Sequence, residues 1–136
     1  MNQKGFSLIE LVMVIVILAI LGAVAIPKYV NLQTEAKAAN EAGVVAGVRA
    51  GILTYFIDPA RGNRLTYPPT LDASVNGACS PTNPCFTTVL SQGGITEQWF
   101  KKEDNLALGF SAYGSPSPGG VTNWFYRPAT GEFVKQ

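Results

Sequence analysis

The hydrophobic pattern divides the chain into an apolar N-terminal run and a longer region of mixed character. Leu11 to Ile26 is unbroken apolar sequence, and Phe6 extends the run backwards with only two polar interruptions. A helix rises about 1.5 Å per residue, so Phe6 to Ile26 would span roughly 32 Å, close to the roughly 30 Å hydrocarbon core of a bilayer. The pattern therefore predicts a membrane-spanning helix at the N-terminus and a soluble region after Pro27.

Beyond Pro27 the pattern becomes that of an amphipathic helix. Val45, Val48 and Ile52 recur at helical spacing, and alanines between the polar positions favour helix. Asp58-Pro59 supplies a stop, because the residue before a proline avoids the α region. We therefore predict one continuous helix from Phe6 to Ile57, whose second half carries a domain on one face.

The region from Asp58 to Gln136 alternates short apolar segments with turn-forming residues, which predicts an antiparallel sheet of three or four strands packed on the helix. The expected class is α+β. Strands are expected at Leu106–Tyr113, Trp124–Tyr126 and Glu132–Lys135, a hairpin turn at Arg127–Gly131, a short helix or strand at Phe86–Leu90 and an irregular loop at Ser115–Gly120.

Composition narrows the possible functions of the 136-residue chain. Ten basic and nine acidic residues give a net charge of +1, which removes the electrostatic case for a nucleic-acid binder. There is no histidine, so histidine-based catalysis and most zinc sites are excluded. No pair of residues suggests an active site, and we expect neither an enzyme nor a cofactor.

Three outcomes of proteolytic processing of the apolar run are possible. An ordinary secretory signal peptide would be cut after the small residues Ala23-Val24-Ala25, although the run is longer than a usual signal core. An uncleaved anchor would keep Glu10 as a tolerated polar residue near the bilayer edge. In the third case the cut falls before the apolar run, which is retained.

The segment Lys4-Gly5-Phe6-Ser7-Leu8-Ile9-Glu10 favours the third case. It resembles the prepilin processing motif of type IV pilins and pseudopilins, in which a basic residue, glycine, an apolar residue, serine or threonine, two aliphatic residues and glutamate follow one another. The resemblance implies cleavage between Gly5 and Phe6 and methylation of the new Phe6 amine. It also implies a pilin-like fold.

Glu10 is the one carboxylate in the apolar run, and a carboxylate at the centre of a membrane helix costs about 2.5–3.5 kcal/mol on insertion scales. Within one chain it could neutralise the Phe6 amine one turn earlier and complement the helix dipole. The pilin resemblance instead implies that Glu10 pairs with the Phe6 amine of a neighbouring subunit. Such a pair would set the register of a filament, because an unpaired charge in an apolar core penalises other registers.

The resulting organisation has four parts: residues 1–5 as leader, 6–27 as membrane and assembly helix, 28–57 as the second half of the helix, and 58–136 as the globular region. Gly22 and Pro27 are the weak points of the helix, where we expect a kink. The resemblance adds that this segment loses helicity locally in a filament.

The two cysteines, Cys79 and Cys85, bracket a five-residue loop that contains two prolines. Export would place this loop in an oxidising compartment, so we expect a disulfide that stabilises by roughly 2 kcal/mol, with free thiols as the alternative. Asp72, Glu103 and Asp104 could be considered for calcium, but their spacing fits no calcium loop, and we expect a solvated acidic turn. The aromatic residues Trp99, Phe100, Trp124, Phe125 and Tyr126 are expected to pack the sheet against the helix.

We therefore predict a pilin-like filament subunit. It would wait in the inner membrane with a periplasmic domain and then enter an extracellular pilus. The resemblance implies as partners identical subunits, minor pilins, a prepilin peptidase, a platform protein and an assembly ATPase. A pseudopilin of a type II secretion system is the first alternative, and an exported or anchored binding domain that does not polymerise is the second.

Overall fold

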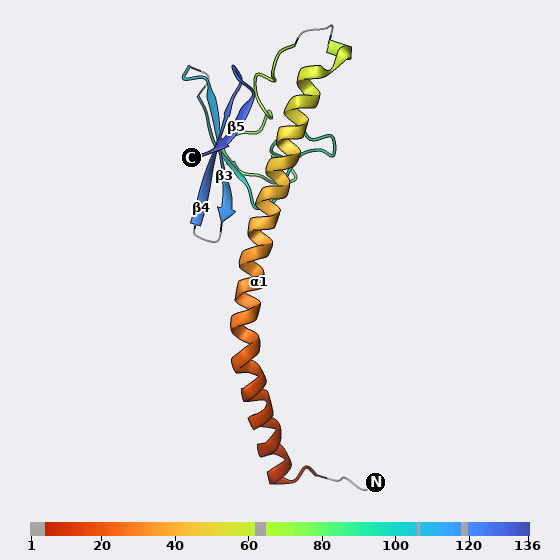
Figure 1. Cartoon of the computed structure of the whole chain (residues 1–136), viewed down its shortest axis with the longest axis vertical. Helices are drawn as coiled ribbons and strands as arrows, with labels where there is room; N and C mark the ends of the chain where they lie inside the picture. The colour runs from red at the N-terminus through yellow and green to blue at the C-terminus, as the bar shows by residue number, and fades with distance from the viewer. Residues whose placement is uncertain (1–4, 62–64, 106, 118–119) are drawn as a thin grey trace. The chain divides into compact units, whose positions relative to one another are not determined.

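The computed structural model describes residues 5–61, 65–105, 107–117 and 120–136 and contains one long helix and one sheet (Figure 1). Helix α1 runs from Leu8 to Ile57 and is followed by the short 3-10 helix η1 (Pro59–Arg61). Five strands follow in chain order: β1 (Gly77–Ala78), β2 (Phe100–Asn105), β3 (Phe110–Ser117), β4 (Gly120–Arg127) and β5 (Glu132–Lys135). The chain divides into two compact units, one ending at Ala36 and the other beginning at Lys37.

The predicted continuous helix is confirmed, with its end at Ile57 and its start two residues later than expected. Ile57 is the last helical residue because Asp58 precedes a proline, and the Asp58 side chain then accepts a hydrogen bond from the Ala60 amide (3.0 Å). Pro27 lies within the helix without ending it.

The sheet is antiparallel with the order β1-β2-β3-β4-β5, so each strand pairs with the next one along the chain. The α+β class is confirmed, and the sheet has five strands rather than three or four. Strand β5 and the turn before it match the prediction, because the Gly131 amide closes the turn on the Arg127 carbonyl (2.8 Å).

Strand β3 begins later and ends later than predicted. Asn105 begins a turn, since its backbone and side-chain oxygens both accept hydrogen bonds from the Leu108 amide. Gly109 completes this turn with φ 72°, so the strand starts at Phe110. Leu106, where the prediction began, lies outside the described residues.

The loop predicted over Ser115–Gly120 is wrong for its described part. Strands β3 and β4 stay paired as far as Ser117 and Gly120, and Pro116 lies opposite Val121. Proline is tolerated there because β2 pairs with β3 only up to Gly114, so β3 has a neighbour on one side alone beyond that point. Pro118 and Gly119 lie outside the described residues.

The segment Phe86–Leu90 forms neither the helix nor the strand that we expected. It is a turn in which the Phe86 carbonyl accepts hydrogen bonds from the Val89 and Leu90 amides (3.2 and 3.0 Å). Phe86 has φ 64°, and its side chain is fully buried. A single L residue in the left-handed region ends any regular element, which explains the difference.

The core lies between the second half of α1 and the sheet. The helix contributes Val45, Val48 and Ile52, which confirms the predicted spacing. The other large buried apolar and aromatic residues are Leu71, Phe86, Trp99, Tyr113, Trp124, Tyr126 and Phe133.

Two polar helix residues join α1 to the sheet. The Arg49 guanidinium donates two hydrogen bonds to the Phe133 carbonyl (3.1 and 2.9 Å) and lies over the Trp124 ring. The Trp124 indole donates to the Glu41 carboxylate (2.8 Å). These bonds fix the side of α1 on which strands β4 and β5 lie.

Candidate functional site

The residues of the processing motif lie at the start of α1. Gly5, Phe6 and Ser7 precede the helix, and the bond from the Leu11 amide to the Ser7 carbonyl (3.2 Å) belongs to its first turn. Glu10 is the acidic residue of that turn, where a negative charge complements the helix dipole. Residues 1–4, which include Lys4 and most of the proposed leader, lie outside the described residues.

Phe6 and the first part of the helix expose apolar side chains on every side. Phe6 is 83% exposed, and Val12, the least exposed large apolar residue of this stretch, is still 40% exposed. The exposed large apolar residues are Phe6, Leu8, Ile9, Leu11, Val12, Met13, Val14, Ile15, Val16, Ile17, Leu18, Ile20, Leu21, Val24, Ile26, Tyr29, Val30 and Leu32.

This part of α1 is long and apolar enough to cross a membrane, with a mean hydropathy of 3.0 over eighteen residues. A helix that is apolar on every side is stable only inside lipid or among other helices. Glu10 is the one charged residue between Phe6 and Ile26. The arrangement is therefore a long contact surface with a single carboxylate near its start.

Gly22 has an open surrounding within its own chain: a Cβ added there would meet no atom within 4 Å. Packing inside the subunit therefore does not require glycine at this position. Pro27 is exposed and lies five residues further along the same helix. The kink proposed for these two residues remains a prediction.

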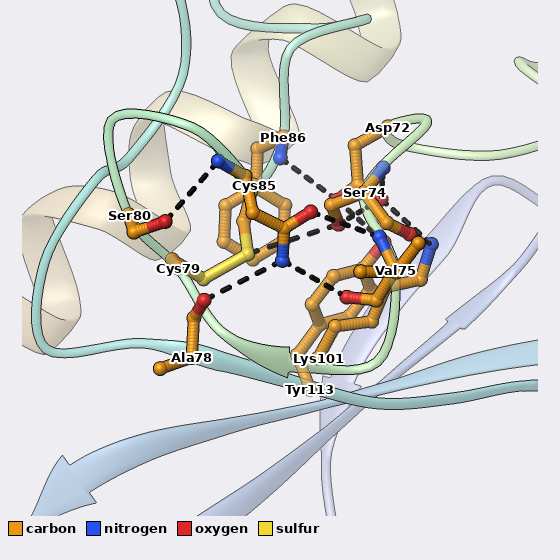
Figure 2. Close-up of a disulfide and its surroundings, with 11 residues drawn as sticks. Asp72, Ser74, Val75, Ala78, Cys79, Ser80, Cys85, Phe86, Lys101 and Tyr113 are labelled. Carbon is orange, nitrogen blue, oxygen red and sulfur yellow. Dashed lines mark hydrogen bonds and ion pairs between the residues drawn. A yellow bond between two sulfur atoms is a disulfide. The ribbon is translucent and has the colours of Figure 1, made fainter.

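In the globular region the expected disulfide joins Cys79 and Cys85, whose Cα atoms lie 5.5 Å apart. Both cysteines are buried. The loop between them is held by the Asn83 side chain, which donates to the Val75 carbonyl (3.0 Å) and accepts from the Val75 amide (2.9 Å). The segment before Cys79 and the disulfide loop are thus tied together (Figure 2).

The expectation of a solvated acidic turn is wrong for Asp72, whose side chain is buried. Its carboxylate pairs with the Lys101 ammonium at 2.7 Å, and the two side chains are 0% and 1% exposed. Asp72 also accepts hydrogen bonds from the Phe86 amide (2.8 Å), the Tyr113 hydroxyl (3.0 Å) and the Ser74 hydroxyl (2.7 Å), as Figure 2 shows.

The second carboxylate near Lys101 is Asp104, which lies 2.6 Å from the ammonium and is 30% exposed. Burial alone would lower the pKa of Lys101, but the hydrogen bonds to Asp104 and Asp72 outweigh burial and raise it above 10.5. Burial, reinforced by the Asp72 charge, also raises the pKa of Tyr113 far above its ordinary 10.0. The lysine is therefore charged and the tyrosine neutral across the physiological range.

The sequence pattern contained one signal for this buried pair. Residues of a strand point alternately to the two faces of a sheet, so Lys101 shares a face with the buried Trp99. If strand β2 had been recognised from the sequence, Lys101 would have been predicted to lie in the core. A buried lysine would then have indicated an acidic partner. The turn-like composition of Glu103-Asp104-Asn105 concealed that strand.

In the part of the chain that the structure describes, no group of three or more histidine, cysteine or acidic side chains could hold a metal ion. The predicted aromatic packing is confirmed at Trp99, Trp124 and Tyr126, which are buried, whereas Phe100 and Phe125 are half-buried. The notable features of the described residues are therefore apolar packing, one disulfide and a buried ion pair.

Comparison with known proteins places this arrangement in a family. The family model of the prokaryotic N-terminal methylation motif matches residues 1–26. The type IV narrow pilus major component PilA5 of Thermus thermophilus is 37% identical over 110 residues, which cover 71% of this chain and 93% of that protein. The fimbrial protein EcpC of Eikenella corrodens is 27% identical over 103 residues, or 70% of this chain and 67% of that protein.

A shorter match is found with another pilin. The type IV major pilin PilE1 of Neisseria gonorrhoeae is 38% identical over 56 residues, which cover 41% of this chain and 34% of that protein. No solved structure matches the chain significantly. A long apolar helix with a processing motif, followed by a small antiparallel sheet, defines a pilin-type subunit. The chain belongs to the type IV pilin family.

Proposed function

We propose that this protein is a structural subunit of a type IV pilus filament. A prepilin peptidase cuts between Gly5 and Phe6, the new Phe6 amine is methylated, and the subunit assembles through the first part of α1. The observation that carries the proposal is the exposed apolar surface that extends from Phe6 through the first part of α1 to Leu32, in which no large side chain is buried.

This surface cannot remain in water. Each exposed aliphatic side chain contributes roughly 1.5–3 kcal/mol when it leaves water, so the stretch is stable only in lipid or in contact with other apolar helices. The subunit therefore waits in the inner membrane with its globular region in the periplasm. Assembly transfers the same surface from lipid to the helices of neighbouring subunits, where small residues such as Gly22 allow close approach.

Glu10 gives this otherwise nonspecific surface a register. Its carboxylate pairs with the Phe6 amine of a neighbouring subunit, because both charges enter an environment that water does not reach. Any other axial offset leaves one charge without a partner, and an uncompensated buried charge is costly. Loss of helicity near Gly22 and Pro27 adjusts the helix to the filament.

The partners of such a subunit are further copies of itself, minor pilins, the peptidase, a membrane platform protein and an assembly ATPase. The filament lies outside the cell. The protein performs no reaction of its own. The pseudopilin alternative shares the whole N-terminal mechanism, but the relatives that cover 71% and 70% of this chain are named as pilus and fimbrial components, which favours a pilus.

Intact mass spectrometry of the protein from membranes tests the proposal. We expect the loss of residues 1–5 and the addition of one methyl group. A new terminus at Ile26 would instead establish an ordinary signal peptide and overturn the proposal.

Sheared surface filaments supply the second measurement. They should contain the processed chain. If deletion of the protein stopped protein secretion but left pili intact, the pseudopilin alternative would replace a pilus role.

A further inference from the structure

The disulfide and the buried Lys101–Asp72 pair are neighbours in space (Figure 2). Phe86 follows Cys85 directly, and its amide donates to Asp72 at 2.8 Å. The Ser74 hydroxyl, which donates to Asp72, also lies 3.9 Å from the Cys85 sulfur. The two features therefore share one set of contacts.

The buried pair depends on every one of these contacts. Two charges removed from water are stable only when their remaining hydrogen-bonding capacity is satisfied. Lys101 and Tyr113 come from the regular strands β2 and β3, which hold them in place. Asp72, Ser74 and the Phe86 amide come instead from a stretch of irregular backbone.

Little regular structure orders that irregular stretch from residue 72 to 86. It contains the two-residue strand β1, isolated bridges and turns. Phe86 has φ 64°, a conformation that persists in an L residue only when its surroundings impose it. Cys85 imposes it from one side, since its amide and carbonyl both pair with Ile95 (2.9 and 2.8 Å) and its sulfur is bonded to Cys79.

We propose that the Cys79–Cys85 disulfide controls burial of the Lys101–Asp72 pair, so that the globular region reaches its packed state only after oxidation. In the reduced chain residues 72–85 detach locally, Asp72 leaves the core, and Lys101 contacts water. The Phe86 ring stays packed on Trp99, Tyr113 and Phe133, so the helix and strands β2 to β5 remain assembled.

Oxidation of the two thiols releases two protons and two electrons. A disulfide-containing oxidant accepts the electrons by thiol–disulfide exchange and is reduced to a dithiol. The location of this step after export rests on the proposed function, whereas the coupling between disulfide and buried pair does not.

Amine labelling of the full chain in detergent micelles tests the coupling. The oxidised protein and the phosphine-reduced protein are treated with an amine-acylating reagent, and labelling is read at each lysine by peptide mass spectrometry. We expect the Lys101 labelling rate to rise by roughly tenfold or more on reduction, because a buried amine reacts only through opening of the structure. Lys102 and Lys135 are exposed and serve as internal references whose rates stay constant.

Variants distinguish the effect of losing the disulfide from any other effect of the reducing agent. The C79S/C85S double variant should label at Lys101 like the reduced protein, without any reductant. The protein unfolded in concentrated urea provides the fully opened reference.

Equal protection of Lys101 in the oxidised and reduced proteins would overturn the coupling. Simultaneous loss of the β-sheet circular dichroism would overturn the local release, since the whole domain would then have unfolded. Neither readout involves filament formation, so failure of the pilus proposal would leave this test unaffected.

Discussion

The backbone of Gly51 in α1 lies against the backbone of Val89. A Cβ added at Gly51 would stand 2.0 Å from the Val89 carbonyl oxygen and 2.8 Å from its carbon. One turn earlier, a Cβ at Gly47 would make an ordinary 3.5 Å contact with Leu90. The turn that carries Phe86 into the core therefore packs directly on helix backbone, and only glycine at position 51 allows this approach.

Replacement of Gly51 by alanine should destabilise the globular region by about 1–3 kcal/mol, the usual cost of overpacking. The matched control is Gly43→Ala, because a Cβ at Gly43 meets nothing within 4 Å. That variant should gain about 0.5–1 kcal/mol from better helix propensity. Denaturant unfolding of both variants in the same detergent gives the comparison, and equal stabilities would contradict the close approach.

Loss of the Asp72 charge should lower the free energy of unfolding far more than loss of an exposed ion pair. Asp72→Asn leaves the buried Lys101 ammonium with Asp104 as its remaining carboxylate partner, and breaking a buried ion pair costs up to about 3–5 kcal/mol. The exposed pair between Arg127 and Glu132, at 3.5 Å, is the control. Arg127→Gln should cost at most about 1 kcal/mol.

A third variant tests whether the loss of stability in Asp72→Asn comes from the buried Lys101 charge. Lys101→Met in the Asp72→Asn background removes that charge. The double variant should be more stable than Asp72→Asn alone, as measured by urea unfolding midpoints. A double variant less stable than the single one would show that the lysine contributes mainly through packing.

The globular region should lose stability in alkali. Burial raises the folded-state pKa of both Tyr113 and Tyr126 above 10.0, and the carboxylates raise that of Lys101 above 10.5. Each group contributes its full stabilisation below the unfolded-state pKa and loses it as the pH rises towards the folded-state pKa. Unfolding free energies should therefore be nearly constant from pH 7 to about 9.5 and fall above about pH 10.

The variant Tyr126→Phe checks the cause of this alkaline loss. It removes one of the titrating hydroxyls together with the hydrogen bond to the Pro68 carbonyl (2.6 Å), so its stability should be lower at pH 7. Its decrease above pH 10 should be shallower than that of the native chain. Parallel pH profiles would assign the loss to other groups.

The helix and its core face could be predicted from the sequence because both depend on local pattern. The spacing of Val45, Val48 and Ile52 and the stop at Asp58-Pro59 are sufficient for that part. The hairpin before β5 was equally clear, since Gly131 supplies the positive φ that its turn requires.

The position of Asp72 could not be predicted, because its burial depends on residues distant in sequence. Lys101 is 29 positions away and Tyr113 is 41 positions away. A carboxylate in a polar stretch indicates solvent exposure unless its partners are known. Strand β2 was missed for a local reason, since its residues Lys102, Glu103 and Asp104 are typical of a turn.

Glu10 provides the sharpest test of how subunits recognise one another. Glu10→Gln keeps the size of the side chain and removes its charge, and Glu10→Val also makes insertion into lipid easier by up to a few kcal/mol. If the carboxylate pairs with the Phe6 amine of a neighbour, both variants should be processed and inserted but should enter filaments poorly. Yield should fall by roughly tenfold or more, since about 1.4 kcal/mol already corresponds to a factor of ten and a buried charge without its partner costs more.

The carboxylate of Glu35, exposed further along α1, supplies the matched control. Glu35→Gln removes an equal charge outside the apolar run and should leave filament yield unchanged. If Glu10 acted only within its own chain, its loss would weaken the first helical turn by tenths of a kcal/mol, and filaments would form at nearly normal yield. The measurement compares the processed subunit in membranes with the subunit in sheared filaments for each variant. Normal filaments from a processed Glu10→Gln protein would exclude the pairing between subunits and leave Glu10 a role in its own helix alone.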